Sequence, residues 1–187
     1  MKAKVILVTG GARSGKSTFA EQLAAQAAGP VAYIATAQVY DEEMRHRVDL
    51  HQERRPAHWQ TYEAPYHADT VLEEALQGPA QAVLFDCLTL YTTNLLLQLA
   101  ESVSREQRAA QILAAIDRLL AAARQGTAPV IFVTNEVGMG IVPENPLARE
   151  YRDIAGWVNQ RAAVAADQVY LVVCGLATEI KKNAVWL

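Results

Sequence analysis

The sequence has 187 residues, of which 51% are hydrophobic and 20% charged, and a formal net charge of −3. This length suits one domain with a full core, so we expect residues 1–187 to form a single domain. The mild acidity offers no large basic field for DNA or RNA, although it is compatible with a local basic patch, so nucleic acid is not expected as the main partner. There is no apolar run of about 20 residues and no signal-peptide pattern, so no membrane span and a cytoplasmic location are expected.

The most informative stretch is residues 10–17, GGARSGKS, which fits the phosphate-loop pattern G-x-x-x-x-G-K-[ST] in full. An apolar run over residues 5–8 predicts a buried strand before it, and an amphipathic pattern predicts a helix over residues 18–28 after it. Strand, glycine loop and helix is the context that this pattern requires. The flanks therefore favour a nucleotide-binding domain over a glycine-rich turn that matches by chance.

The residue types of this loop predict how it binds a nucleoside triphosphate. Glycines let the backbone approach phosphates closely and point N–H groups at them, beside the positive end of a helix dipole. Lys16 is expected to reach the outer phosphates, and the Ser17 hydroxyl to be one ligand of Mg²⁺. The predicted nucleotide-binding residues of the loop are Gly10, Gly11, Ala12, Arg13, Ser14, Gly15, Lys16 and Ser17.

The rest of the chain alternates apolar strands with helical patterns. Strands are predicted over residues 31–36, 58–63, 82–86, 130–134 and 168–173, with an edge strand after Gly175, and helices over residues 41–55, 67–76, 88–100, 104–126 and 145–165. Right-handed crossovers between such strands give a mainly parallel sheet with helices on both faces. We therefore expect an α/β fold of the P-loop NTPase class, with its ligands at the carboxyl ends of the strands.

Several predictions concern burial. Cys87 and Cys174 have neither metal-site spacing nor the density of a disulfide scaffold, so both are expected to be small core residues. Leu147 is expected to face inward on the last helix. Residues 88–100 are apolar nearly all round, which indicates either a buried helix or a subunit contact. Residues 135–143 form a long loop with Gly-x-Gly at the ligand edge, of the kind that closes over a substrate.

Asp86 ends an apolar strand, which is the pattern of a Walker B strand whose acid holds Mg²⁺ directly or through water. The competing interpretation is that Asp merely begins a turn there. Because the phosphate loop is present, we take Asp86 as the second predicted metal ligand.

The predicted helix over residues 41–55 delivers His51 to the apolar face that holds Met44 and Val48. A histidine satisfied by a core carbonyl is the competing interpretation of that position. The same short segment places Arg47, Arg54 and Arg55 close to His51 in the sequence. Such a cluster favours a phosphate group as its ligand, with a solvated basic face as the alternative.

Several blocks of the sequence together resemble the bifunctional adenosylcobinamide kinase / adenosylcobinamide-phosphate guanylyltransferase family of cobalamin biosynthesis. The blocks are residues 7–17, 33–37, 55–59, 134–145 and 152–156, followed by Asn159 and Gln160. The phosphate loop is common to many families, whereas TNEVGMGIVPEN and RPAHW are much more specific. The resemblance covers about residues 5–175.

The resemblance implies a RecA-like P-loop fold, a homotrimer and two activities. The kinase phosphorylates the aminopropanol hydroxyl of adenosylcobinamide. The guanylyltransferase then transfers GMP from GTP to adenosylcobinamide phosphate, giving adenosylcobinamide-GDP and pyrophosphate. In this family the transfer passes through a guanylylated histidine, whose position falls on His51. Some relatives carry two adjacent histidines there, whereas this chain has Leu50 before His51.

The resemblance also implies site residues. Lys16 and His51 become catalytic, Ser17 and Asp86 become ligands of Mg²⁺, and GTP and ATP become substrates. The family's further nucleotide contacts fall on Ala35, Thr36, Ala37, Gln52, Glu53, Arg54, Arg55, Glu63 and Asp86. A neutral imidazole suits this role, because its free nitrogen can attack the α-phosphorus of GTP. The nucleotide preference and general base of the kinase step, and the corrinoid contacts, stay open.

Two other functions are compatible with a phosphate loop. One is a simple small-molecule kinase, in which His51 is structural, only the γ-phosphate moves and no covalent intermediate forms. The other is a nucleotide-dependent switch that binds a protein partner. Against the switch, the guanine-reading Asn-Lys-x-Asp pattern is absent, and the nearest stretch is Thr134-Asn135-Glu136-Val137.

Overall fold

The structure is a computed structural model that describes residues 4–38, 42, 45–46, 56–100 and 102–185. Its strands are β1 (Val5–Gly10), β2 (Val31–Ala35), β3 (Gln60–Glu63), β4 (Ala82–Asp86), β5 (Val130–Asn135), β6 (Gln168–Val173) and β7 (Leu176–Glu179). Its helices are α1 (Lys16–Ala24), α3 (Ala68–Gln77), α4 (Leu88–Gln98), α5 (Arg105–Ala123) and α6 (Pro146–Ala165), with a short 3₁₀ turn, η1 (Lys181–Asn183).

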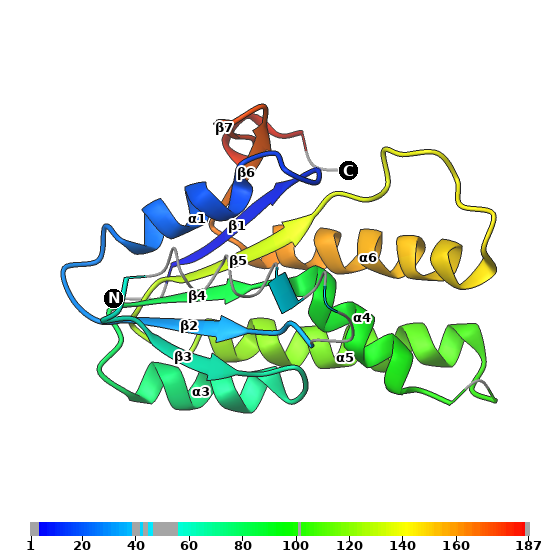
Figure 1. The fold of residues 1–187 in the computed structure, drawn as a ribbon, viewed down its shortest axis with the longest axis horizontal. Coiled ribbons are helices and arrows are strands. Elements are labelled where there is room, and N and C mark those ends of the chain that lie inside the picture. The colour runs from blue at the N-terminus through cyan, green and yellow to red at the C-terminus, as the bar shows by residue number, and fades with distance from the viewer. Residues whose placement is uncertain (1–3, 39–41, 43–44, 47–55, 101, 186–187) are drawn as a thin grey trace.

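These strands form one sheet in the order β3-β2-β4-β5-β1-β6-β7, as Figure 1 shows. Every neighbouring pair is parallel except β6 with β7, which is antiparallel. The mainly parallel α/β prediction is therefore confirmed, and so is the edge strand after Gly175. The carboxyl ends of β1, β2, β4 and β5 lie along one edge, where parallel α/β sheets bind their ligands.

Helices cover both faces of the sheet (Figure 1). Alternate strand residues such as Ile6 and Val8 pack with Ala20 and Ala24 of α1 on one face. Their neighbours, such as Leu7, pack with α3, α4, α5 and α6 on the other face. Strands that are buried on both faces need nearly continuous apolar sequence, which explains the uninterrupted runs in β1, β2, β4 and β5.

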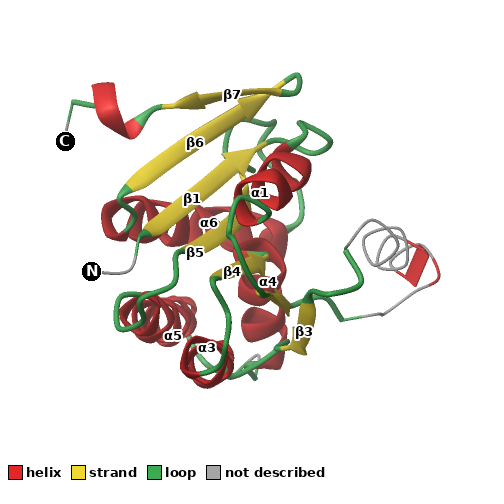
Figure 2. Ribbon diagram, turned by 90° about the vertical axis from the view of Figure 1, so that its left-hand side faces the viewer, coloured by secondary structure: helices red, strands yellow, loops and turns green. Residues whose placement is uncertain are grey.

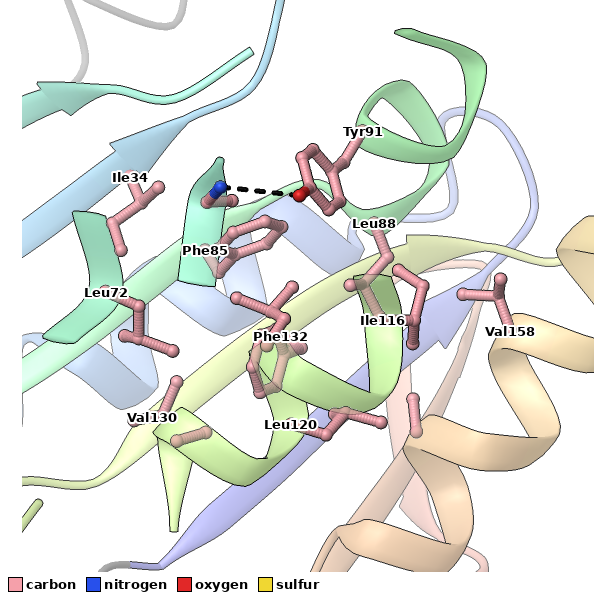
Figure 3. Packing of buried hydrophobic residues seen from close by; sticks show 14 of the residues in the cluster. Ile34, Leu72, Phe85, Leu88, Tyr91, Ile116, Leu120, Val130, Phe132 and Val158 are labelled. Atoms are coloured by element: carbon pink, nitrogen blue, oxygen red, sulfur yellow. Dashed lines mark hydrogen bonds between the residues drawn. The ribbon is translucent and has the colours of Figure 1, made fainter. Parts of the chain in front are cut away.

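The larger cluster has an aromatic centre, drawn in Figure 3. The ring of Phe85 lies 6.0 Å from that of Tyr91 and 5.3 Å from that of Phe132, centroid to centroid. The buried hydroxyl of Tyr91 accepts a hydrogen bond of 3.3 Å from the backbone N–H of Ala68. This bond ties the first residue of α3 to α4 and satisfies the tyrosine oxygen inside an apolar core.

The first helix differs from its predicted bounds. It begins at Lys16 rather than Thr18, because Gly15 adopts φ 96° and serves as its N-cap. It ends at Ala24 rather than Ala28, because the N–H groups of Gln26 and Ala27 bond three residues back, to Leu23 and Ala24. This tighter turn closes the helix early.

Two burial predictions were wrong. Cys174 is exposed, because it forms the turn between β6 and β7 with φ 54° instead of continuing the strand into the core. Leu147 is 46% exposed, because it lies in the first turn of α6 next to an exposed loop. Cys87 is buried, as predicted.

Other details agree with the sequence patterns. Ser104 and Gln107 form the capping box at the start of α5. Helix α4 buries Leu88 and Leu96, while Leu97 is 55% exposed. Of the helices in the described ranges, none combines the length and the apolarity needed to cross a membrane.

Candidate active site

The phosphate loop leaves β1 at Gly10 and enters α1 at Lys16. A Cβ atom on Gly10 would lie only 2.4 Å from the carbonyl oxygen of Val172, so this position accepts no larger residue. Inside the loop, the N–H of Ser14 donates to the carbonyl of Gly11 at 3.3 Å. The loop is thus folded closely on itself at the start of a helix, which is the arrangement that binds phosphate.

The side chain of Lys16 is packed against the folded phosphate loop and does not extend into solvent. Only 9% of the residue is exposed, and its Nζ donates a hydrogen bond of 3.1 Å to the carbonyl of Gly11. Burial lowers the pKa of Lys16, and the nearby Cys87 and Asp86 oppose that shift. An ammonium group held among backbone groups of the loop is already in place for a phosphate.

Asp86 lies at the carboxyl end of β4 and is held from the neighbouring strand. The hydroxyl of Tyr33 in β2 donates a hydrogen bond of 2.9 Å to its Oδ2. Ser17 lies in the first turn of α1. In the described part of the chain, no three His, Cys, Asp or Glu side chains gather as a metal-binding group. An Mg²⁺ ion would therefore combine Ser17 and Asp86 with phosphate oxygens and water, a set of oxygen ligands that this ion prefers.

Thr36 ties these strand ends together. Its Oγ1 donates to the carbonyl of Cys87 at 2.9 Å and accepts from the N–H of Cys87 at 2.8 Å. Its carbonyl accepts a hydrogen bond of 2.8 Å from Nδ2 of Asn94 in α4, and Thr36 is fully buried. The Thr36 side chain therefore positions the segment after β4.

Three predicted contact residues lie in a row across the sheet. Ala35 is the register partner of Glu63 on one side and of Asp86 on the other. Glu63 is exposed at the end of β3, and Ala37 is partly buried beyond the end of β2. The structure thus brings Ala35, Glu63 and Asp86 to one edge.

The predicted nucleophile lies outside the described residues, and so do Gln52, Glu53, Arg54 and Arg55. Their segment joins β2 to β3 in the chain and leaves the sheet at the carboxyl end of β2, the same edge at which Asp86 lies.

Sequence reasoning missed a polar network behind the phosphate loop. The N–H of Asn135, the register partner of Gly10, donates to Oγ1 of Thr89 at 2.7 Å. Oγ1 of Thr134 donates to Oδ1 of Asn159 at 2.7 Å, and Nδ2 of Asn159 donates to the carbonyl of Asn135 at 3.1 Å. The signal was the polar residues that end an otherwise apolar strand, and the network fixes the end of β5 beside the loop.

Beyond Asn135 the chain forms an exposed loop. Met139, Ile141 and Val142 are 84%, 98% and 61% exposed. The backbone of the loop is nevertheless tethered, because Nη2 of Arg152 donates to the carbonyl of Gly138 at 2.8 Å and Nη1 of Arg149 donates to that of Pro143 at 2.9 Å. The predicted loop at the ligand edge is present, and it is open to solvent.

Two solved structures share this fold. The KaiC-like protein PH0186 of Pyrococcus horikoshii OT3 superposes with a TM-score of 0.52 at 16% identity, covering 91% of this chain and 72% of that protein. A prototypical ATPase from the type III secretion system of pathogenic bacteria superposes with a TM-score of 0.56 at 15% identity, covering 98% of this chain and 59% of that protein. Identities this low show the P-loop NTPase fold alone.

Sequence comparison is far more specific. The bifunctional adenosylcobalamin biosynthesis protein CobU of Salmonella typhimurium is 52% identical over 182 residues, covering 95% of this chain and 99% of that protein. The Escherichia coli protein of the same name is 46% identical with the same coverage. CobP of Pseudomonas aeruginosa is 44% identical over 94% of this chain and 96% of its own length. Residues 6–180 match one family throughout. The chain therefore belongs to the cobinamide kinase / cobinamide phosphate guanyltransferase family.

Proposed function

We propose that this chain catalyses two successive reactions at one edge of its sheet. It phosphorylates the aminopropanol hydroxyl of adenosylcobinamide, and it then transfers GMP from GTP to the adenosylcobinamide phosphate. The observation that carries the proposal is the shared edge itself. The phosphate loop with Lys16 and the Asp86 carboxylate lie at the carboxyl ends of β1 and β4, and the segment that carries His51 follows the carboxyl end of β2 in the chain.

The kinase step relies on positioning and charge. The loop N–H groups and Lys16 hold the phosphates of the donor, so that the γ-phosphorus faces the incoming hydroxyl. The P–O bond to the donor diphosphate breaks as the bond to the hydroxyl oxygen forms, and the hydroxyl proton leaves. Mg²⁺ held by Ser17 and Asp86 would neutralise charge on the phosphate oxygens.

The guanylyl transfer uses His51 as nucleophile. Its neutral imidazole attacks the α-phosphorus of GTP, the bond to pyrophosphate breaks, and the imidazole loses its other proton. A phosphate oxygen of adenosylcobinamide phosphate then displaces the histidine and gives adenosylcobinamide-GDP. Arg47, Arg54 and Arg55 are the cations available to stabilise the transition state, while Lys16 holds the leaving pyrophosphate.

Several residues at the β2–β3 side are assigned to the guanine nucleotide of this second step. Support comes from the register that aligns Glu63, Ala35 and Asp86 at the edge from which the His51 segment leaves. An exposed Glu63 carboxylate is an acceptor for the N–H groups of guanine or for ribose hydroxyls. Ala37, Gln52 and Glu53 complete the assigned set.

A homotrimer in the cytoplasm is part of the proposal. The exposed apolar side chains of Met139, Ile141 and Val142 support a subunit contact, because single chains rarely leave such residues together in solvent. Size-exclusion chromatography with light scattering would give three times the 20.4 kDa chain mass.

The two activities are tested by incubating the purified protein with adenosylcobinamide, Mg²⁺, ATP and GTP and separating the corrinoid products. The proposal predicts adenosylcobinamide phosphate first and adenosylcobinamide-GDP second, with both rates lowered about 100- to 1,000-fold in Lys16→Ala. Accumulation of adenosylcobinamide phosphate, together with no conversion of added adenosylcobinamide phosphate to adenosylcobinamide-GDP, would mean that the chain is a simple kinase.

A further inference from the structure

We propose that the turn joining β6 to β7, residues 173–176, is a second subsite for a purine base, occupied by the nucleotide that serves as phosphoryl donor in the kinase step. The inference rests on the proposed binding of triphosphate by the phosphate loop. It places the donor base on the opposite side of the loop from the guanine contacts at Ala35 and Glu63.

The turn is packed directly against the phosphate loop. The N–H of Gly175 donates a hydrogen bond of 2.8 Å to the carbonyl of Ser14. A Cβ atom on Gly15 would lie 3.2 Å from Cα of Gly175, so the two backbones touch at the start of α1. A ligand that fills the loop is therefore next to this turn.

The order of strands gives the direction of a donor nucleotide whose γ-phosphate lies near Asp86. Figure 2 shows β6 and β7 at one edge of the sheet, with β1 next to β6. Asp86 lies two strands from β1 on the other side, at the end of β4. Strands are about 4.8 Å apart, so three spacings, roughly 14 Å, separate the ends of β4 and β6. A donor whose γ-phosphate lies near Asp86 and Lys16 extends across the loop toward the turn.

The surface of the turn suits the face of a base. Val173 and Leu176 are 55% and 75% exposed, and they are register partners, so their side chains lie on one face of the hairpin. Cys174 between them is also exposed, and residues 173–176 include no charged side chain. An apolar, uncharged surface favours the flat face of a purine over a phosphate or carboxylate.

Two base subsites on opposite sides of one phosphate loop explain how one site serves two reactions. With the base on the β6–β7 turn, the γ-phosphorus is the atom presented toward β4 and β2, as phosphorylation requires. With the base at the β2–β3 edge, the pyrophosphate occupies the loop and the α-phosphorus lies toward the ends of β2 and β3. The turn offers mainly backbone and aliphatic groups, so it should accept adenine and guanine alike.

Cys174 is a built-in reporter of this subsite. It is exposed, whereas Cys87 is buried, so alkylation by iodoacetamide at pH 8 reports on Cys174. With Mg²⁺ and the ATP analogue AMP-PNP, we expect alkylation to slow at least fivefold. Saturating inorganic triphosphate, which lacks a base, should change the rate less than twofold.

Three results would overturn the inference. Equal protection by triphosphate would mean that filling the loop alone shields the turn. Full reactivity under AMP-PNP that is shown to be bound by equilibrium dialysis would place the base elsewhere, and loss of reactivity with rising protein concentration alone would make the turn a subunit contact. If neither AMP-PNP nor triphosphate bound, the phosphate-loop assignment itself would fail, which distinguishes that failure from the others.

A pair of variants tests the subsite by kinetics. Leu176→Ser should raise the KM for ATP in the kinase step about tenfold, while the KM for GTP in transfer to supplied adenosylcobinamide phosphate changes less than twofold. Val164→Ser, at an apolar position of α6 that is 65% exposed, is the matched control and should change neither constant. A parallel rise of both constants in Leu176→Ser, or no rise in either, contradicts two separate base subsites.

Discussion

The hydroxyl of Tyr33 donates a hydrogen bond of 2.9 Å to Oδ2 of Asp86, from one strand of the sheet to the next. Tyr33 is 3% exposed, so this donor cannot be replaced readily by water. A carboxylate fixed by a partner behind it binds a metal ion at a lower cost in conformational entropy. Tyr33 is therefore a positioning residue for the proposed Mg²⁺ ligand.

Tyr33→Phe removes this hydrogen bond and keeps the buried ring. We expect about tenfold more Mg²⁺ for half-maximal kinase activity, because partners behind a ligand typically contribute that much to metal affinity. Tyr62→Phe in β3 is the control and should leave the Mg²⁺ dependence unchanged. Identical Mg²⁺ titrations of Tyr33→Phe and wild type would remove Tyr33 from this role.

Thr36→Val tests the tie between β2 and the segment after β4. The substitution keeps the shape of the side chain but leaves the N–H of Cys87 without its partner, while the carbonyl of Cys87 still accepts from the N–H of Tyr91. An unsatisfied buried donor costs about 1–3 kcal/mol, so we expect a loss of that size in urea unfolding. Thr36→Ser retains the hydroxyl and should lose less than half of that. Equal stability of the two variants would show that the hydroxyl is dispensable.

Cys87 makes stability depend on pH in the alkaline range. Burial, followed by the nearby Asp86 charge, raises the pKa of its thiol from 9.0 to about 12. The folded protein thus holds a proton that the unfolded chain releases, so this contribution is complete below pH 9 and is lost as the pH rises from 9 toward 12. Cys87→Ser does not titrate in this range. Its urea midpoint should fall less than that of wild type between pH 8 and 11, and parallel declines would contradict the assignment.

Arg108 and Glu150 form a two-bonded ion pair between α5 and α6. Nε and Nη2 of Arg108 donate to Oε1 and Oε2 of Glu150 at 2.8 and 2.7 Å, and Glu150 is only 5% exposed. Glu150→Gln should cost about 3 kcal/mol, because it removes the carboxylate charge from a mostly buried ion pair. Asp153→Asn breaks the exposed pair with Arg105 and should cost less than about 1 kcal/mol. Thermal unfolding of both variants measures these two costs. Equal losses of stability would contradict the idea that burial makes the Arg108–Glu150 pair the more important one.

The same pair gives an acid dependence of opposite sign to that of Cys87. The hydrogen bonds from Arg108 lower the pKa of Glu150 below its usual 4.5. Its contribution is therefore present above that pH and is lost as the pH falls through the lowered pKa. The free energy of unfolding of wild type should therefore approach that of Glu150→Gln in acid. A difference in free energy of unfolding that stays constant from pH 7 to pH 3 would contradict this.

Local patterns in the sequence predicted the strands, the phosphate loop and Asp86, because each depends on neighbouring residues. They did not predict Tyr33 as a partner of Asp86, since that contact depends on β2 lying beside β4 in the sheet. Cys174 was placed in the core because an apolar run precedes it, yet a turn with two consecutive positive φ values ends the strand there. Leu147 fits the helical stripe, but it lies in the first turn of α6, next to an exposed loop.

The same contrast between local patterns and long-range contacts holds for the site. Lys16 and the glycines follow from the loop pattern, whereas the hydrogen bonds between the Thr36 hydroxyl and Cys87 were not predicted. The position of Thr36 just past a strand signalled the ligand edge correctly. Whether a side chain there faces a ligand or another strand depends on packing between distant segments, which no local pattern contains.

Transfer through His51 is tested most directly with GTP labelled at the α-phosphate, incubated with Mg²⁺ and no corrinoid. We expect label on wild type that is stable to base and labile to acid, as a phosphoramidate is, and none from γ-labelled GTP. His51→Ala should take up no label, while His46→Ala, at an exposed position of the same segment, should label like wild type. Equal labelling of His51→Ala, or formation of adenosylcobinamide-GDP by that variant at the wild-type rate, would contradict a guanylyl-His51 intermediate.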